Sequence, residues 1–129
     1  MVLYLAADLL WGTKIKATAA AVGVNARPVR TLDMLLARLA DAPADDPVRG
    51  VLLDLEKPDE ALAMLAHLRP PAGPPGPPGP PAAHPFPVLC WAPHVETGLM
   101  ARARAAGADR VLTRGAMDAQ LEALLGGMR

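Results

Sequence analysis

A short apolar run that ends in a single carboxylate constrains this chain more than any other feature. Residues 51–53 read Val-Leu-Leu, Asp54 closes the run, and Pro58 follows shortly after. A run of this kind predicts a buried parallel strand, and open α/β sheets carry their ligand sites at the carboxyl ends of such strands. Burying a charge is costly unless it is paired, hydrated or metal-bound. Asp54 is therefore either a functional group or a structural residue that caps nearby backbone amides.

Length and composition limit the class of protein. The chain has 129 residues, which fits one domain over residues 1–129, and its core must be built mainly from small side chains because only 3% of residues are aromatic. The formal net charge is zero, so we expect no nucleic-acid partner. The sequence shows no signal peptide and no apolar stretch of membrane-spanning length. We therefore expect a cytoplasmic protein without a membrane partner.

Strand-like and helix-like patterns alternate along the chain, which indicates a parallel sheet with crossover helices. Pro28 cannot donate a ladder hydrogen bond, so the second strand belongs at a sheet edge. These features predict an α/β fold with a flavodoxin-like, doubly wound, five-stranded parallel sheet in the order 2-1-3-4-5. The expected strands are residues 2–6, 26–30, 51–55, 88–91 and 110–112.

Capping residues and glycines set the expected helix ends. Asp8, Thr31 and Asp59 are placed to cap the first, second and third helices. Gly23 and Gly107 are placed to end the first and fourth helices, the fourth covering residues 95–106. Apolar residues recur at helical spacing and predict the buried faces of the first, second, third and last helices: Trp11, Ile15, Ala19 and Val22; Leu32, Leu35, Leu36 and Leu39; Leu62, Leu65 and Leu68; and Met117, Leu121, Leu124 and Leu125.

A Pro/Gly-rich insert precedes the fourth strand. It covers residues 70–87 and contains three consecutive Gly-Pro-Pro triplets, at residues 73–81. Three triplets are too few for a stable collagen triple helix, so we expect a stiff polyproline II excursion on the surface, facing away from the carboxyl-end site. Its Pro-x-x-Pro spacing leaves open a second interpretation, a ligand for an aromatic groove on a partner.

Three segments, in this order and spacing, resemble the receiver domains of bacterial response regulators, the CheY-like family. They are residues 51–55 with Pro58 after them, residues 87–89 (Pro-Val-Leu), and residues 106–109 (Ala-Gly-Ala-Asp) leading to residues 111–114 (Val-Leu-Thr-Arg). The resemblance covers nearly the whole chain outside the insert. It implies the doubly wound fold and a role in two-component signal transduction, within a phosphorelay.

The resemblance implies that Asp54 is the phosphoacceptor candidate. Receivers take a phosphoryl group on this aspartate with the help of magnesium, which the aspartate and an acidic pair after the first strand hold. Charge neutralisation and positioning supply most of the catalysis of such a transfer. In this chain Ala6 and Ala7 occupy the positions of the acidic pair. Asp8 and Asp54 are then the two candidate magnesium ligands, and the expected metal site is weakened.

Two further positions depart from the family pattern. Ala92 stands where receivers have a hydroxyl residue after the fourth strand, and Arg114 stands where they have a lysine after the fifth. Alanine cannot hydrogen-bond a phosphoryl oxygen, and a planar guanidinium is not interchangeable with a compact ammonium. These substitutions around a retained aspartate indicate a degenerate pseudo-receiver.

The remaining polar residues suggest how such a site is stabilised. An ion pair between Arg114 and Asp54 would neutralise the buried carboxylate without metal. His94 is expected to be a solvated loop residue, and Cys90 a buried thiol without catalytic function. His67 and His84 are too scattered in the sequence to predict a metal cluster with Cys90. The residues expected at the rim of the site are Asp8, Ala92, His94, Glu96 and Arg114.

Three classes of function follow. The first is a stand-alone, non-enzymatic signalling module that binds a protein partner, a kinase or a downstream signalling protein, through the face of the fourth helix, fifth strand and fifth helix. The second is a working phosphoacceptor that uses Asp54 with Asp8 as metal ligand. The third is a small-molecule binder or enzyme on the same fold, although the residues after the first strand lack the Gly-x-Gly-x-x-Gly pattern of a dinucleotide site. We favour the first, with no catalytic residues and no cofactor apart from the weakened magnesium site.

Overall fold

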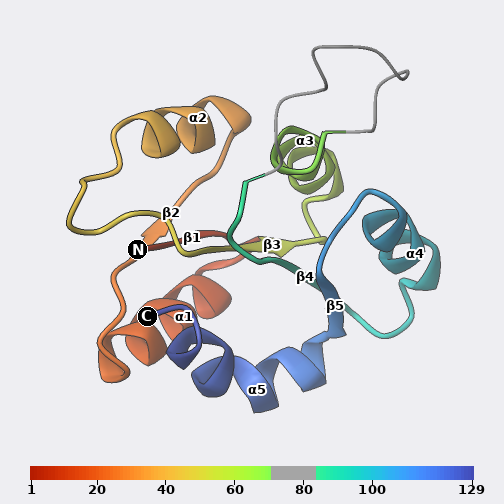
Figure 1. Ribbon diagram of the computed structural model, residues 1–129. Coiled ribbons are helices and arrows are strands. Elements are labelled where there is room, and N and C mark those ends of the chain that lie inside the picture. The colour runs from red at the N-terminus through yellow and green to blue at the C-terminus, as the bar shows by residue number, and fades with distance from the viewer. Residues whose placement is uncertain (71–83) are drawn as a thin grey trace, which may run out of the picture.

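Five parallel strands form one sheet in the part of the chain that the structure describes, in the order β2-β1-β3-β4-β5 (Figure 1). This structure is a computed structural model and describes residues 1–70 and 84–129. Its elements, in chain order, are β1 (Val2–Leu5), α1 (Leu9–Ala21), β2 (Ala26–Pro28), α2 (Leu32–Ala40), β3 (Gly50–Asp54), α3 (Pro58–Leu68), β4 (Val88–Ala92), α4 (Thr97–Ala105), β5 (Arg110–Thr113) and α5 (Arg114–Gly126).

The predicted flavodoxin-like architecture is confirmed. β2 is an edge strand that ends at Pro28, which pairs in register with Tyr4. β3 lies at the centre, between β1 and β4, and its last residue, Asp54, pairs in register with Trp91. The Gly-Pro-Pro triplets and most of the insert lie outside the described residues, so their conformation stays a prediction.

Helices cover both faces of the sheet. Figure 1 shows α1 and α5 on one face and α2, α3 and α4 on the other. Alternate residues of β3 enter opposite apolar clusters: Val51 and Leu53 pack toward the side of α2, α3 and α4, whereas Leu52 packs toward α1 and α5. Trp91 lies in the second cluster, where its ring centroid is 5.3 Å from that of Trp11. None of the described helices is long and apolar enough to cross a membrane.

Most helix ends follow the predicted capping residues. Asp8 and Thr31 accept hydrogen bonds from the backbone N–H groups of Trp11 and Met34, at 2.8 and 3.1 Å. Gly23, at φ +77°, follows the first helix as expected.

Two local expectations were wrong, and one helix is slightly shorter than predicted. α3 starts at Pro58 after Lys57, so Asp59 lies within the first turn and is not the cap. Proline is suited to the first helical position because it needs no partner for a backbone N–H. Leu36 is 37% exposed, because α2 faces the sheet through Leu35. α4 begins at Thr97 and ends at Ala105, inside the predicted range of 95–106.

Arg69 ties the chain on the two sides of the insert together. Its Nη1 donates to the carbonyl oxygens of Leu68 and His84, at 3.1 and 2.9 Å, and its Nη2 donates to that of Phe86 at 2.8 Å. The same Nη2 contacts Oδ2 of Asp109 at 2.8 Å. One guanidinium thus fixes the segment that leads into β4.

The partner of Arg69, Asp109, holds the start of β4. Its Oδ2 also accepts the backbone N–H of Val88 at 2.7 Å. Gly107 makes this approach possible: it has φ +102°, and a Cβ there would lie 2.9 Å from Cβ of Arg69. The residue that ends the fourth helix therefore also makes room for the Arg69 side chain.

The histidines beside this contact are closer together than the sequence suggested. The rings of His67 and His84 have centroids 6.0 Å apart, and His84 stacks on Phe86 at 5.2 Å. Burial lowers the pKa of His84, and the neighbouring His67 and Arg69 lower it further. These rings form an aromatic contact at the base of the insert.

Replacing Arg69 by methionine should destabilise the fold, because it keeps the side-chain stem but leaves Asp109 and partly buried carbonyls without their donor. We expect the free energy of unfolding to fall by about 2–3 kcal/mol in urea denaturation. Arg104→Met, at an exposed position of α4, is the matched control and should change it by less than about 0.5 kcal/mol. Equal effects of the two substitutions would contradict this role for Arg69.

Candidate functional site

Asp54 ends the central strand and is almost completely buried, at 1% exposure. Its Oδ2 accepts the backbone N–H of Ala7 at 2.9 Å, and its Oδ1 accepts the backbone N–H of Glu56 at 3.0 Å. The carboxylate therefore joins the loop after β1 to the loop after β3. Of the two interpretations that the sequence left open, the capping of nearby amides is present in the structure.

The surroundings of Asp54 act on its pKa in opposite directions. Burial raises the pKa of this carboxyl, the hydrogen bonds from Ala7 and Glu56 lower it, and the nearby carboxylates of Glu56 and Asp8 raise it again. The net result is a pKa above the ordinary value for aspartate. The two backbone donors thus only partly offset the loss of hydration.

An acidic groove lies beside Asp54, at the carboxyl ends of the strands. Its volume is about 490 Å³, and it is lined by Asp8, Glu56 and Glu96 together with Ala7 and Pro93. Asp8 and Glu96 are among the residues predicted for this rim. Glu56 was missed by the sequence reasoning, although its position directly after the strand end could have suggested it.

Arg114 does not contact Asp54 as predicted. Its Nη1 lies 3.4 Å from Oε1 of Glu56, and both side chains are partly exposed. The predicted Arg114–Asp54 ion pair is therefore wrong: two backbone amides already satisfy the aspartate, and the guanidinium, on the first residue of α5, pairs with the more accessible carboxylate. An exposed pair of this kind contributes less than about 1 kcal/mol.

The other predicted rim residues differ in accessibility. Ala92 ends β4, is fully buried within the cluster beneath α3 and α4, and pairs in register with Thr113. His94 and Glu96 lie exposed in the connection between β4 and α4. Ala92 therefore presents only a methyl group near the strand end.

The fit of these residues to magnesium can be tested on the geometry. Both oxygens of Asp54 already accept backbone N–H groups, and Oδ1 of Asp8 caps α1. Within residues 1–70 and 84–129, no group of three or more His, Cys, Asp or Glu side chains is placed to hold an ion. Magnesium demands near-ideal octahedral geometry and open oxygen ligands. Asp8 and Asp54 are a sparse ligand set for such an ion, and both are already engaged with backbone donors, although each oxygen keeps a second lone pair.

Cys90 is buried, as predicted. It is fully buried in β4, and burial raises the pKa of its thiol to about 12. A thiol with this pKa stays protonated near neutral pH, so it is a weak nucleophile.

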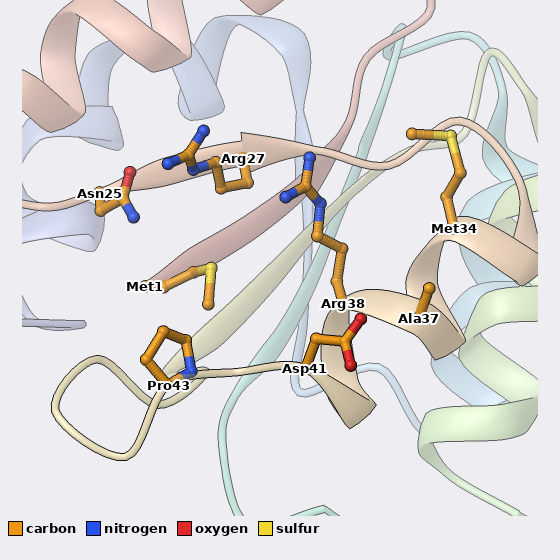
Figure 2. Close-up of a pocket in the computed structure, with 8 residues that line it drawn as sticks. All are labelled: Met1, Asn25, Arg27, Met34, Ala37, Arg38, Asp41 and Pro43. Atoms are coloured by element: carbon orange, nitrogen blue, oxygen red, sulfur yellow. The ribbon is translucent and has the colours of Figure 1, made fainter.

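Another groove lies at the opposite end of the strands. Its volume is about 420 Å³, and Met1 and Asn25, which line it, directly precede β1 and β2. Figure 2 shows Arg27 of β2 and Arg38 of α2 among its lining side chains. This groove is remote from the carboxyl end of β3 and has no part in the Asp54 site.

Comparisons of the fold identify the class of protein that this architecture resembles. The receiver domain of NtrX from Brucella abortus superposes with a TM-score of 0.72 and 19% identity, covering 99% of this chain and 97% of that one. A response regulator receiver protein from Burkholderia phymatum gives 0.70 and 22%, covering 98% and 92%. A response regulator from Burkholderia pseudomallei, solved with a phosphorylated aspartic acid, a calcium ion and citrate, gives 0.67 and 18%, covering 99% and 65%.

These structural neighbours are response regulator receiver domains, and the chain has their CheY-like fold. The fold implied by the sequence resemblance is thereby confirmed. No protein-family model matches the sequence, and a comparison with curated proteins finds no match. At these low identities the likeness establishes the architecture and leaves the chemistry of the site to its own residues.

The raised pKa of Asp54 makes stability depend on pH in a defined direction. The pKa of Asp54 is higher in the folded state than in the unfolded state. Such a group contributes stability that is fully present below the unfolded-state pKa, and this stability is lost as the pH rises through the folded-state pKa. Asparagine does not titrate. The difference in Tm between Asp54→Asn and the unmutated protein should therefore become more positive from about pH 3.5 to about pH 7.

Thermal melts followed by circular dichroism across this pH range check the trend. Asp45→Asn, which removes an exposed carboxylate, is the control and should show a smaller change. A difference for Asp54→Asn that becomes more negative as the pH rises would show that the folded protein favours the ionised carboxylate.

Proposed function

We propose that this chain is a receiver-fold signalling module that acts by binding a protein partner and whose phosphorylation site is degenerate. The observation that carries the proposal is the state of Asp54, which is buried with both oxygens hydrogen-bonded to main-chain amides. Such a carboxylate is satisfied without a cation. Transfer of a phosphoryl group to it would turn one of these two acceptors into a weaker, uncharged ester-type oxygen.

The neighbouring residues support the same proposal. Charge neutralisation around a transferred phosphoryl group normally comes from metal ions and cationic side chains. Here the groove beside Asp54 is lined by the carboxylates of Asp8, Glu56 and Glu96, and Arg114 is paired with Glu56. Ala92 has no hydroxyl group that could donate a hydrogen bond to a phosphoryl oxygen. We propose no enzymatic activity for this arrangement.

The partner is a protein, either a kinase or a downstream signalling protein. Its docking surface is the face formed by α4, β5 and α5. β5 is an edge strand of the sheet, so α4 and α5 flank an accessible edge. Arg110 of β5 and Gln120 of α5 are joined there by a 2.9 Å hydrogen bond. This bond links the strand to the helix across the proposed face.

The alternative is a working phosphoacceptor of a two-component phosphorelay. Two observations favour it: Asp54 stands at the carboxyl end of the central strand, and the Burkholderia pseudomallei neighbour was solved with a phosphorylated aspartic acid and a calcium ion. Under this alternative, Asp54 would bind the metal and the phosphoryl group through lone pairs that its backbone donors do not use, or in place of those donors.

Intact-protein mass spectrometry after incubation with acetyl phosphate and magnesium separates the two proposals. We expect no phosphoryl adduct on the unmutated protein, because its aspartate is already held by backbone donors and its acidic pair is replaced by alanine. A receiver of known phosphorylation, treated in parallel, checks the reagent. An adduct that forms on this protein and is absent in Asp54→Asn would establish the alternative.

A further inference from the structure

A second cavity opens at the carboxyl ends of β1 and β2, beside α1. Its volume is about 480 Å³, within the size range of small-molecule sites. Tyr4, Leu5 and Val29, all buried, contribute to its lining. Ala7 and Asp8 border both this cavity and the acidic groove, but Asp54 lines neither. The cavity is therefore a separate feature of the same end of the sheet.

Three cationic side chains from three different elements line this cavity. Lys16 belongs to α1, Arg30 lies in the connection after β2, and Lys57 directly precedes α3. Among the described residues, none of them takes part in an ion pair. The lining contains one carboxylate, Asp8, which caps α1 through Oδ1. Positive charge is therefore in excess here, in contrast to the acidic groove on the other side of Asp8.

Gly12 keeps this cavity open. It lies within α1, where glycine is less favourable than alanine. A Cβ at this position would meet Ala6 Cβ and Tyr4 Cε2 at 3.9 Å each, which is ordinary van der Waals contact. Packing therefore does not require glycine. Its effect is to leave unfilled the space in front of Tyr4.

We propose that this cavity binds a small organic phosphate, with the phosphate held by Arg30, Lys57 and Lys16 and a compact apolar body placed against Tyr4 and Val29. A phosphate group accepts charge-assisted hydrogen bonds from guanidinium and ammonium groups, and a guanidinium can hold it with two parallel bonds. The apolar floor suits the organic part of the molecule.

The position of the cavity agrees with a general rule for this architecture. Ligands of doubly wound sheets bind at the carboxyl ends of the strands, and this cavity opens at that end, one strand away from the point between β1 and β3 where the strand order reverses. The cavity is lined by residues from the ends of β1 and β2 and from the loop after β3. The proposal does not depend on phosphorylation of Asp54.

Phenyl phosphate is the probe, titrated at constant ionic strength and followed by amide chemical shifts in two-dimensional NMR. We expect saturable shifts of residues around Tyr4, Gly12 and Arg30. Inorganic phosphate should bind more weakly because it lacks the apolar body, and benzyl alcohol should not bind because it lacks the charge.

Four variants test the assignment. Arg30→Gln removes an exposed cation and should weaken binding by about tenfold, whereas Gly12→Leu should fill the cavity and abolish binding. Arg27→Gln removes the same charge from the opposite groove of Figure 2 and should leave affinity unchanged. Arg104→Gln, at an exposed position of α4 outside the cavity lining, should also leave it unchanged, and because no variant alters Asp54, the test is separate from the function of the aspartate.

Two results would overturn the proposal. One is the absence of saturable shifts with phenyl phosphate at millimolar concentration. The other is equal weakening by Arg27→Gln and Arg30→Gln, which would mean that the phosphate responds only to surface charge. Because Arg30 is exposed, its replacement should leave the fold intact and keeps the test independent of any disturbance by Gly12→Leu.

Discussion

The pair of hydrogen bonds that Asp54 accepts from Ala7 and Glu56 determines the arrangement of the whole carboxyl end of the sheet. A carboxylate buried at the end of the central strand must be stabilised, and here main-chain donors from two loops do so. The loop after β1 is thereby fixed beside the loop after β3. Asp8, Glu56 and Lys57, which line the acidic groove or the cationic cavity, lie in or next to these two loops.

The charged residues around this contact differ on the two sides of Asp8. Alanine at positions 6 and 7 places no carboxylate side chain beside Asp54, and the backbone amide of Ala7 donates to it. On one side of Asp8 lies a groove with three carboxylates, and on the other a cavity with three cations. The proposed small anionic ligand would bind on the cationic side of Asp8, away from the acidic groove.

The sequence predicted the fold well because the signals of that fold are local. The alternation of periodicities, Pro28 at the edge and the cap at Asp8 depend on neighbouring residues. The site was predicted in part: Asp54 and Asp8 were placed correctly, but the partner of Arg114 was not. That contact joins residues 58 positions apart, and the Arg69–Asp109 contact joins residues 40 apart. Side-chain partners at such separations depend on the packed loops, which periodicity does not specify.

The amide signals of Ala7 and Glu56 test the central claim most directly, since they report on both donors to Asp54. In a pH titration followed by two-dimensional NMR, both amides should shift together, with one midpoint above the ordinary aspartate value of about 3.9. Addition of magnesium at neutral pH should leave both signals in place. Independent behaviour of the two amides, or saturable movement of both with magnesium, would contradict a carboxylate held by the main chain and would favour a metal-binding receiver site.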